Sequence, residues 1–206
     1  MTDPDQEDMS RARQVMKYLM EHPELKIIFE WQETDGIIDV YTDSDWATCP
    51  VTRKSVSGGT ILNGKHLIAH WTRLQPVVST SSGEAELVAA CTAMSELILV
   101  ENLSEDMNHK WKGRMNVDAR ACKGIVLRKG VGKLKHLTIK FLWIQAAVAA
   151  RKTEVRHIPR HLNVADMFTH GISSGELARH MSTLSCRFTR LCSCRYPPCK
   201  TLNHDG

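Results

Sequence analysis

Residues 36–43, GIIDVYTD, and residues 56–73, VSGGTILNGKHLIAHWTR, decide the fold of this 206-residue chain. The first stretch is rich in β-branched and aromatic residues, which predicts a strand. The second stretch has two apolar runs on either side of Asn63-Gly64, a strong signal for a two-residue turn, and predicts a β-hairpin. We therefore expect three consecutive antiparallel strands, the first of which ends at Asp43.

Helices and strands alternate after this hairpin. Ser81, followed three residues later by Glu84, forms the pattern of a capping box and predicts the start of a helix. The buried stripe of that helix is expected to hold Leu87, Cys91, Met94 and Ile98. The remaining expected elements are a strand over 114–121, helices around 119–128 and 136–152, a strand over 153–159 and a short helix over 163–171. This order predicts one mixed sheet flanked by helices.

The ends of the chain differ from this alternating part. Residues 9–22 have the apolar spacing of an amphipathic helix that ends at His22-Pro23, and residues 25–31 are expected to be extended. Beyond Leu184 the periodicity fades into a tail rich in cysteine.

Composition limits the class of protein. The chain is 42% hydrophobic, enough to bury a core, and no apolar run approaches the length of a bilayer span. The acidic, polar first ten residues do not form a secretory signal. The chain has seven cysteines, an odd number, and the wide scatter of Cys49, Cys91 and Cys122 is typical of reduced thiols rather than a disulfide framework. We therefore expect an intracellular protein that has no membrane partner.

Charge is distributed unevenly along the chain. Residues 1–109 hold 8 Lys and Arg against 18 Asp and Glu, whereas residues 110–160 hold 14 Lys and Arg against 2 acids. The basic segment is either a solvated face that offsets the acidic half or a surface that contacts a polyanion. We favour contact with nucleic acid.

Four acids are expected at comparable places in this fold. Asp43 and Asp118 end strands, Glu86 lies near the start of the helix after the hairpin, and Asp166 lies near the start of the last helix. Sites in open α/β sheets gather at the carboxyl ends of strands. Four converging carboxylates would repel one another unless divalent cations bind them, and Mg²⁺ prefers such oxygen ligands. The pattern therefore predicts a site for two metal ions.

Each acid taken alone also has a structural explanation. Glu84 is expected to cap its helix, and Asp45 is expected to cap the turn that follows Asp43. Asp39 is interpreted as a sheet-surface acid, and the dipole of the last helix would stabilise Asp166 in any case. The joint placement of the four acids, rather than any one of them, favours the metal site.

Five segments together resemble the ribonuclease H domain of copia-type retrotransposon Pol polyproteins. They are VYTDSDWA, SGGTILNGKHLIAHWTRLQPVVSTSSGEAELVAA, NVDARAC, LKHLTIKFLWIQ and VRHIPRHLNVADMFTHG, in the order and spacing of that family. The resemblance covers about residues 33–172. Residues 1–32 resemble the segment that joins the reverse transcriptase to this domain, and residues 173–206 are expected to form a disordered, Cys-rich tail.

The resemblance implies an α/β, ribonuclease H-like fold with a five-stranded mixed sheet, three antiparallel strands followed by parallel ones. It implies hydrolysis of the RNA strand of RNA/DNA hybrids during reverse transcription, with two Mg²⁺ ions, for which Mn²⁺ can substitute, and no small-molecule cofactor. By motif, the catalytic and metal-binding residues are Asp43, Glu86, Asp118 and Asp166. The implied partners are the hybrid and the reverse transcriptase region of the same polyprotein, in the cytoplasm, in a virus-like particle or in the nucleus.

Basic residues are expected to hold the phosphates of the hybrid, and the binding should weaken steeply with salt. The candidates are Arg128, Lys129, Lys133, Lys135, Arg160 and His161. His161 precedes the last acid as a loop histidine does in cellular ribonucleases H, but the gap is shorter, so simple contact with phosphate is the alternative. In the tail, Cys186, Cys192, Cys194, Cys199 and His204 could bind Zn²⁺, although their spacing lacks the usual pairs.

Two other functions compete with the hydrolase. A copy of the domain that has lost activity would bind nucleic acid or reverse transcriptase without cutting, although a binding module has no need of four converging acids. A retroviral-type integrase shares the fold, but its acids follow the order Asp, Asp, Glu, whereas here Glu86 comes between the first two aspartates.

Overall fold

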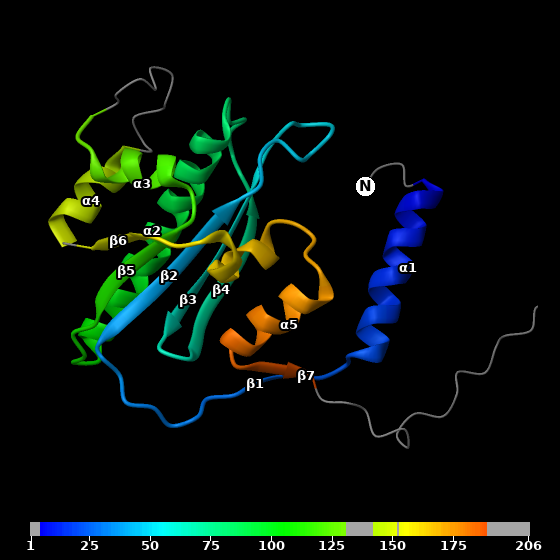
Figure 1. Ribbon diagram of the computed structural model, residues 1–206, viewed down its shortest axis with the longest axis horizontal. Coiled ribbons are helices and arrows are strands. Elements are labelled where there is room, and N and C mark those ends of the chain that lie inside the picture. The colour runs from blue at the N-terminus through cyan, green and yellow to red at the C-terminus, as the bar shows by residue number, and fades with distance from the viewer. Residues whose placement is uncertain (1–4, 131–141, 152, 189–206) are drawn as a thin grey trace, which may run out of the picture. The chain divides into compact units, whose positions relative to one another are not determined.

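The computed structural model describes residues 5–130, 142–151 and 153–188 (Figure 1). Contacts divide the chain into two compact units. The larger unit runs from Ile28 to Ser185, and the smaller one combines residues up to Ile27 with those from Cys186 onward. The functional boundaries expected at residues 32 and 172 stay a prediction.

The larger unit is built on a five-stranded sheet. Its strands are β2 (Ile37–Ser44), β3 (Val56–Asn63), β4 (His66–Leu74), β5 (Lys112–Val117) and β6 (Glu154–His157). Their spatial order is β4-β3-β2-β5-β6. Strands β2, β3 and β4 pair antiparallel, whereas β2 with β5 and β5 with β6 pair parallel. This order and these directions confirm the ribonuclease H-like mixed sheet.

The hairpin between β3 and β4 forms as expected, with a shift in its turn. Asn63 pairs with His66, so the two turn residues are Gly64 and Lys65, one position later than predicted. Gly64 has a φ of 56°, a left-handed conformation that glycine adopts without steric cost. The Asn-Gly signal therefore located the turn but not its central pair.

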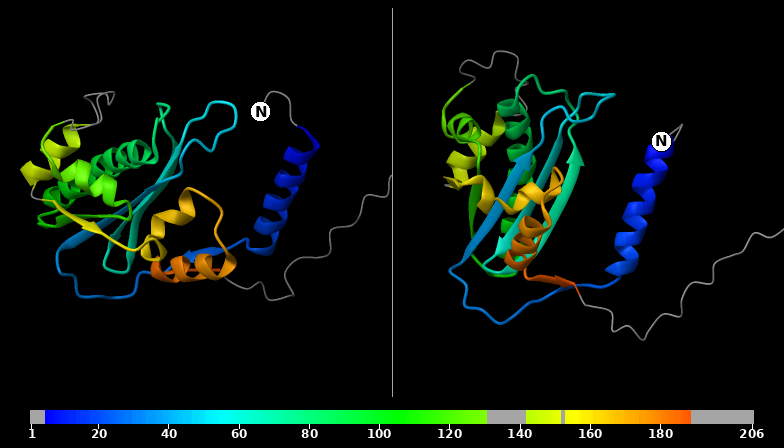
Figure 2. Two further views of the ribbon diagram at one scale, coloured as in Figure 1. Left: turned by 45° about the horizontal axis from the view of Figure 1, so that its top comes forward. Right: turned by 45° about the vertical axis from the view of Figure 1, so that its right-hand side comes forward.

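Helices cover both faces of the sheet (Figure 2). One face packs against α2 (Ser82–Asp106) and α3 (Arg120–Leu127), and α4 (Trp143–Arg151) packs on these two helices. The 3₁₀ helix η3 (Val164–Phe168) lies on β2 and β3 from the other side, next to α5 (Ser174–Thr183) and after the short 3₁₀ helix η2 (Arg160–Leu162). The core therefore lies mainly between the sheet and α2, with a second layer where the chain returns across the sheet.

Helix α2 is the central helix of the core. Its N-cap is Ser81, whose hydroxyl accepts a hydrogen bond from the backbone N–H of Glu84, as predicted. Leu87, Cys91 and Met94 are buried, and Ile98 packs at the edge of the same cluster. The helix is long and apolar enough to cross a bilayer, but 56% of its most apolar window is buried. A core helix explains this composition.

A buried acid links α2 to two other elements. Glu101 accepts a hydrogen bond from the backbone N–H of Gly113 at 2.8 Å through Oε1 and pairs with Arg151 at 2.9 Å through Oε2. Gly113 is in β5 and Arg151 ends α4. Because both carboxylate oxygens have partners, this buried charge is compensated and its role is structural.

One expectation about the ends of elements is tested only in part, and another needs correction. The helix expected over 136–152 is described only as α4, since residues 131–141 lie outside the described part. Helix α5 occupies 174–183, where we expected a disordered tail to begin, so that expectation was wrong for these residues. The hydroxyl of Ser173 accepts from the N–H of Glu176, whose carboxylate bonds back to Ser173, and this capping box starts the helix.

The smaller unit consists of α1 (Gln6–Glu21), β1 (Leu25–Ile27) and β7 (Cys186–Phe188). Helix α1 ends at His22, as predicted, and β1 pairs antiparallel with β7. The ring of Tyr18 meets that of Phe188 edge-on, with 6.0 Å between centroids.

Candidate active site

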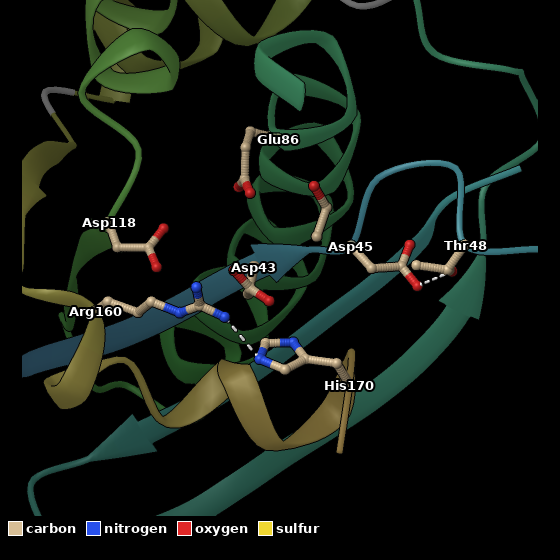
Figure 3. Close-up of a pocket in the computed structure, with 8 residues that line it drawn as sticks. Asp43, Asp45, Thr48, Glu86, Asp118, Arg160 and His170 are labelled. Atoms are coloured by element: carbon tan, nitrogen blue, oxygen red, sulfur yellow. Dashed lines mark hydrogen bonds between the residues drawn. The ribbon is translucent and has the colours of Figure 1, made fainter. Parts of the chain in front are cut away.

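Three of the four predicted acids line one cavity of about 310 Å³ (Figure 3), and the fourth contacts residues that line it. Asp43, Glu86 and Asp118 are among its lining residues, and Asp166 contacts two others, Arg160 and His170. The full lining is Asp43, Ser44, Asp45, Thr48, Glu86, Asp118, Arg160 and His170.

Sheet topology explains why two of the acids meet. Asp43 lies at the carboxyl end of β2, and Asp118 follows β5 directly. These strands are parallel neighbours, so their carboxyl ends lie at the same edge of the sheet.

Glu86 reaches the cavity from the start of α2, whose N-terminus faces the same edge (Figure 3). The neighbouring acid Glu84 has a different role. Its Oε2 accepts hydrogen bonds from the backbone N–H of Thr80 at 2.7 Å and from the Thr80 hydroxyl at 2.8 Å. Glu84 thus has a role at the start of the helix, as predicted, but its carboxylate bonds to Thr80, one residue before the Ser81 amide that we expected.

Asp166 is brought in by η3, which is anchored to β2. The side chain of Asn163, the N-cap of η3, donates from Nδ2 to the carbonyl of Thr42 at 3.1 Å and accepts from Ala165 N–H at 3.2 Å. Both expectations for this helix, its start at Asn163 and the acid in its first turn, are confirmed.

Close contact between η3 and β3 depends on a glycine. A Cβ at Gly58 would lie 2.7 Å from Thr169 Cγ2, 2.9 Å from Phe168 Cβ and 3.2 Å from the Ala165 carbonyl. Gly58 is also the residue of β3 that pairs with Asp43. The missing side chain therefore lets η3 and the residue after it approach the strand next to the first acid.

The acids form two sets that share one member. Ligand atoms of Asp43, Glu86 and Asp118 lie within 4.8 Å of one another, and so do those of Asp43, Asp166 and His170. Asp43, Glu86 and Asp166 are buried, with 5%, 8% and 8% of their surface exposed. Two ligand sets joined by one carboxylate are a suitable arrangement for a pair of metal ions.

Burial and mutual repulsion raise the pKa values of Asp43, Glu86 and Asp118. Burial, followed by the charges of Asp118 and Asp166, raises the pKa of Asp43 to about 6, although a hydrogen bond from Thr169 lowers it. Burial, with the charges of Asp43 and Asp118, raises the pKa of Glu86 to about 8. Burial and the charge of Asp166 also raise the pKa of Asp118. A cation at this place would remove the cost of ionising all of them.

Two buried carboxylate oxygens lack a hydrogen-bond partner among the described residues, namely Glu86 Oε2 and Asp166 Oδ1. Buried polar atoms are normally paired, so such atoms indicate an absent partner. Hard divalent cations accept this kind of oxygen ligand. The donor set and these two atoms therefore fit Mg²⁺ or Mn²⁺.

Arg160 lies over the acids and contacts two of the site residues. Its Nε is 3.3 Å from Asp166 Oδ2, and its Nη2 is 2.7 Å from His170 Nε2 (Figure 3). We had expected Arg160 to hold phosphate, together with His161. His161 is exposed and is not one of the cavity-lining residues, whereas His170 is.

The sequence analysis missed His170 and Thr169. His170 stands four residues after Asp166, a spacing that places two side chains on the same side of a helix. That four-residue spacing is the sequence signal that could have identified His170 as a site residue. The Thr169 hydroxyl donates to Asp43 Oδ2, and His170 Nδ1 lies 3.0 Å from the same hydroxyl.

The structural interpretations of two other acids are confirmed. Asp45 Oδ1 accepts the backbone N–H of Val56 at 2.5 Å, and Oδ2 accepts the hydroxyl of Thr48, so Asp45 holds the turn after β2. Asp39 forms a two-fold contact with Arg114 on the neighbouring strand, with Nε to Oδ1 at 2.6 Å and Nη2 to Oδ2 at 2.5 Å.

The remaining predicted residues are only partly described. Arg128 lines a second cavity, of about 490 Å³, together with Ser81 and Gly83 at the start of α2, and Lys129 is exposed. Lys133 and Lys135 lie outside the described residues. Of the proposed zinc ligands, Cys186 is buried in β7, and Cys192, Cys194, Cys199 and His204 lie outside the described residues.

Comparison with known proteins finds related sequences. The chain is 29% identical over 140 residues to the retrovirus-related Pol polyprotein from transposon TNT 1-94 of Nicotiana tabacum, which covers 66% of this chain and 10% of that protein. It is 25% identical over 176 residues to the Pol polyprotein from transposon RE1 of Arabidopsis thaliana, covering 82% of this chain and 12% of that one. The chain thus spans about a tenth of the length of these relatives.

Among solved structures, the ribonuclease H1 LC11 isolated from compost matches 65% of this chain and 93% of its own, with 22% identity and a TM-score of 0.49. No protein-family model matches the chain. The sequence relatives and the topology of the sheet agree with each other. The chain is a homologue of the Pol polyproteins of plant copia-type retrotransposons, and it has the ribonuclease H-like fold.

Proposed function

We propose that this chain hydrolyses the RNA strand of RNA/DNA hybrids with the help of two divalent metal ions. The observation that carries the proposal is that Asp43 belongs to both ligand sets. A carboxylate that could take part in holding two ions would suit the two-metal, in-line cleavage of a phosphodiester. A binding module would need positive charge at this place rather than four acids.

Two different sets of acids would hold the two ions. Asp43, Glu86 and Asp118 would hold one ion, and Asp43 with Asp166 would hold the other. When bound, the two ions supply activation of the attacking water and stabilisation of the departing ribose oxygen. The buried carboxylates keep their positions because the ends of β2 and β5, the start of α2 and η3 fix their backbones.

Arg160 is suited to orient the substrate. Its side chain is 69% exposed, yet its Nε reaches the buried carboxylate of Asp166. The charge of Asp166 raises the pKa of Arg160, so the guanidinium stays positive. A guanidinium at the mouth of an acidic cavity can bind a non-bridging phosphate oxygen and hold the phosphodiester over the acids.

Basic side chains at the end of α3 support a nucleic-acid duplex as the substrate. Arg128 and Lys129 come from the end of α3 and its following residues, and the cavity that Arg128 lines opens at the start of α2, near Glu86. A duplex phosphate backbone can follow such basic side chains away from the cleavage site. Contacts with 2′-hydroxyl groups in the minor groove would select the RNA strand.

The test is cleavage of a labelled RNA/DNA hybrid by the full chain in Mg²⁺. We expect cleavage that leaves 5′-phosphate ends, is abolished by EDTA and is absent on duplex DNA of the same sequence. Asp43→Asn should reduce the rate at least about 10³-fold, since it removes a ligand common to both ions. Asp106→Asn, at an exposed acid that ends α2, is the matched control and should not change the rate.

Two outcomes would contradict the proposal. Tight binding of the hybrid without cleavage would identify an inactive copy of the domain. Cleavage that Asp43→Asn leaves intact would mean that the nuclease activity comes from elsewhere.

A further inference from the structure

His170 belongs to the site through its geometry. Its Nε2 lies 3.7 Å from Asp166 Oδ2, and its ligand atom lies within 4.8 Å of those of both Asp43 and Asp166. Its side chain is 32% exposed, which leaves the ring accessible from the cavity. It is the one nitrogen donor in the two carboxylate-based ligand sets of the described residues.

The hydrogen bonds around His170 determine which ring nitrogen carries the proton. Arg160 Nη2 can only donate, so Nε2, at 2.7 Å, must accept. The ring proton of the neutral imidazole is therefore on Nδ1, which donates to the hydroxyl of Thr169 at 3.0 Å. That hydroxyl in turn donates to Asp43 Oδ2.

This chain of hydrogen bonds is the support that a metal-binding histidine usually has. Ligating imidazoles typically donate their second nitrogen to a carboxylate, a carbonyl or another polar group, which fixes the tautomer and the direction of the free lone pair. Here the carboxylate of Asp43 acts through Thr169. The lone pair of Nε2 faces Arg160 (Figure 3), and Asp166 Oδ2 lies 3.7 Å from Nε2.

We propose that His170 Nε2 is a ligand of the ion held by Asp43 and Asp166, and that this position binds Mn²⁺ in preference to Mg²⁺. The inference rests on the proposed function, which assigns these acids to metal ions. Imidazole nitrogen favours transition ions, whereas Mg²⁺ prefers oxygen ligands. The set of Asp43, Glu86 and Asp118 offers oxygen alone, so the two positions should differ in ion preference.

Arg160 competes for the same lone pair. Its guanidinium donates to Nε2 and also contacts Asp166 Oδ2, so it serves as an internal cation for this half of the site. An ion at Asp43, Asp166 and His170 must displace it from Nε2. The 69% exposure of the Arg160 side chain gives it room to move toward solvent or toward a bound phosphate.

The experiment is metal binding to the full chain without nucleic acid. The free-ion signal in electron paramagnetic resonance measures Mn²⁺ affinity, and competition with Mg²⁺ measures Mg²⁺ affinity. We expect His170→Ala to weaken Mn²⁺ binding at one position by about 10-fold or more and Mg²⁺ binding much less. His109→Ala removes an exposed imidazole on the chain after α2 and should change neither affinity.

A spectroscopic measurement tests the ligand itself. Pulsed electron paramagnetic resonance of the Mn²⁺-loaded wild-type chain should show coupling to one imidazole nitrogen, and His170→Ala should lack it. Thr169→Val keeps the imidazole but removes its orienting partner, so it should weaken Mn²⁺ binding by about 10-fold. Arg160→Gln should strengthen Mn²⁺ binding, because the competing cation is gone.

The outcomes separate this inference from the proposed function. Absence of nitrogen coupling in the wild-type chain, or equal losses of Mn²⁺ and Mg²⁺ affinity in His170→Ala, would overturn the assignment of His170, even if hybrid cleavage continues. Conversely, nitrogen coupling in a chain that does not cleave the hybrid would support the ligand and reject the nuclease. The nitrogen coupling of the Mn²⁺-loaded wild-type chain tests whether an imidazole is a ligand even if a variant fails to fold.

Discussion

The hydroxyl of Thr169 and the carboxylate of Asp43, 126 residues apart in the chain, form a hydrogen bond across the candidate active site. The bond joins the residue after η3 to the end of β2. It favours the ionised form of Asp43, against burial and the neighbouring carboxylates, which favour the protonated form. Thr169 is thus part of what sets the charge of the acid shared by both ligand sets.

Removal of this hydroxyl should raise the pKa of Asp43 further. In Thr169→Val, the group that favours the carboxylate is lost while burial and repulsion remain, so the pKa should lie above its present value of about 6. Carbon-detected NMR titration of the Asp43 carboxyl in EDTA measures it directly. Thr183→Val, in the last turn of α5, is the control and should leave the pKa unchanged. An Asp43 pKa that stays at the wild-type value would contradict the role of Thr169.

The stability of the chain without divalent ions should fall as the pH rises. Asp43 and Glu86 have folded-state pKa values of about 6 and about 8, both above their ordinary values. Their protonated forms therefore stabilise the fold fully below about pH 4, and this contribution is lost as the pH rises through the folded-state values. For Asp43 alone the shift corresponds to about 3 kcal/mol.

Urea unfolding in EDTA between pH 5 and pH 9 measures this effect. We expect Glu86→Gln to gain stability relative to the wild-type chain as the pH rises, since its amide does not ionise. Addition of millimolar Mg²⁺ at pH 9 should restore much of the loss in the wild-type chain and little of it in Asp43→Asn. A wild-type chain that becomes more stable relative to Glu86→Gln at high pH would contradict the predicted fall of stability with rising pH.

Substitution of Gly58 should weaken metal binding and lower stability, although Gly58 is not itself a proposed metal ligand. In Gly58→Ala the new Cβ would lie within 3 Å of side-chain atoms of Thr169 and Phe168, so η3 must move away from β3. We expect metal affinity to drop at least about 10-fold, with a loss of about 1–3 kcal/mol in the free energy of unfolding. Calorimetric Mn²⁺ titration and urea unfolding check both effects.

Gly175→Ala is the matched control for this change. Gly175 lies in α5, and a Cβ there meets no atom within 4 Å. Alanine in a helix should leave stability equal or slightly higher and should leave metal affinity unchanged. Equal losses of metal affinity and stability in Gly58→Ala and Gly175→Ala would show that close packing at Gly58 is not the cause.

The buried acid Glu101 should matter for stability and not for metal binding. In Arg151→Met the carboxylate of Glu101 stays buried without its cation, which should destabilise the fold by about 3 kcal/mol. Metal affinity should stay within about 2-fold, since neither residue belongs to a ligand set. Arg179→Met, at an exposed arginine of α5, serves as the control for loss of a surface charge. A large fall in metal affinity would show that Glu101 and the active site are coupled.

Local signals were sufficient to predict most of the sheet and its main helix. The β-branched residues of β2, the apolar runs around Gly64 and the capping pattern at Ser81 are short-range features with direct physical causes, and each located its element. The four acids could be found for the same reason, because the ends of these elements determine where the acids lie.

The missed features depend on contacts between distant parts of the chain. The turn of the hairpin lies one residue later than expected because Asn63 remains paired with His66. The roles of Thr169 and His170 arise only when η3 packs on β3. The four-residue spacing from Asp166 to His170 was a local signal, but it does not report that approach. The capping box at Ser173 was a local signal as well, but the loss of periodicity further along the chain led us to extend the tail too far upstream.

Asp43 is the one carboxylate common to both ligand sets of the described residues. Its loss would impair both halves of the centre in a single mutational step, and no neighbouring acid could restore them, because none reaches both. A substitution of this one aspartate is therefore the single change that should disable the proposed metal centre most completely.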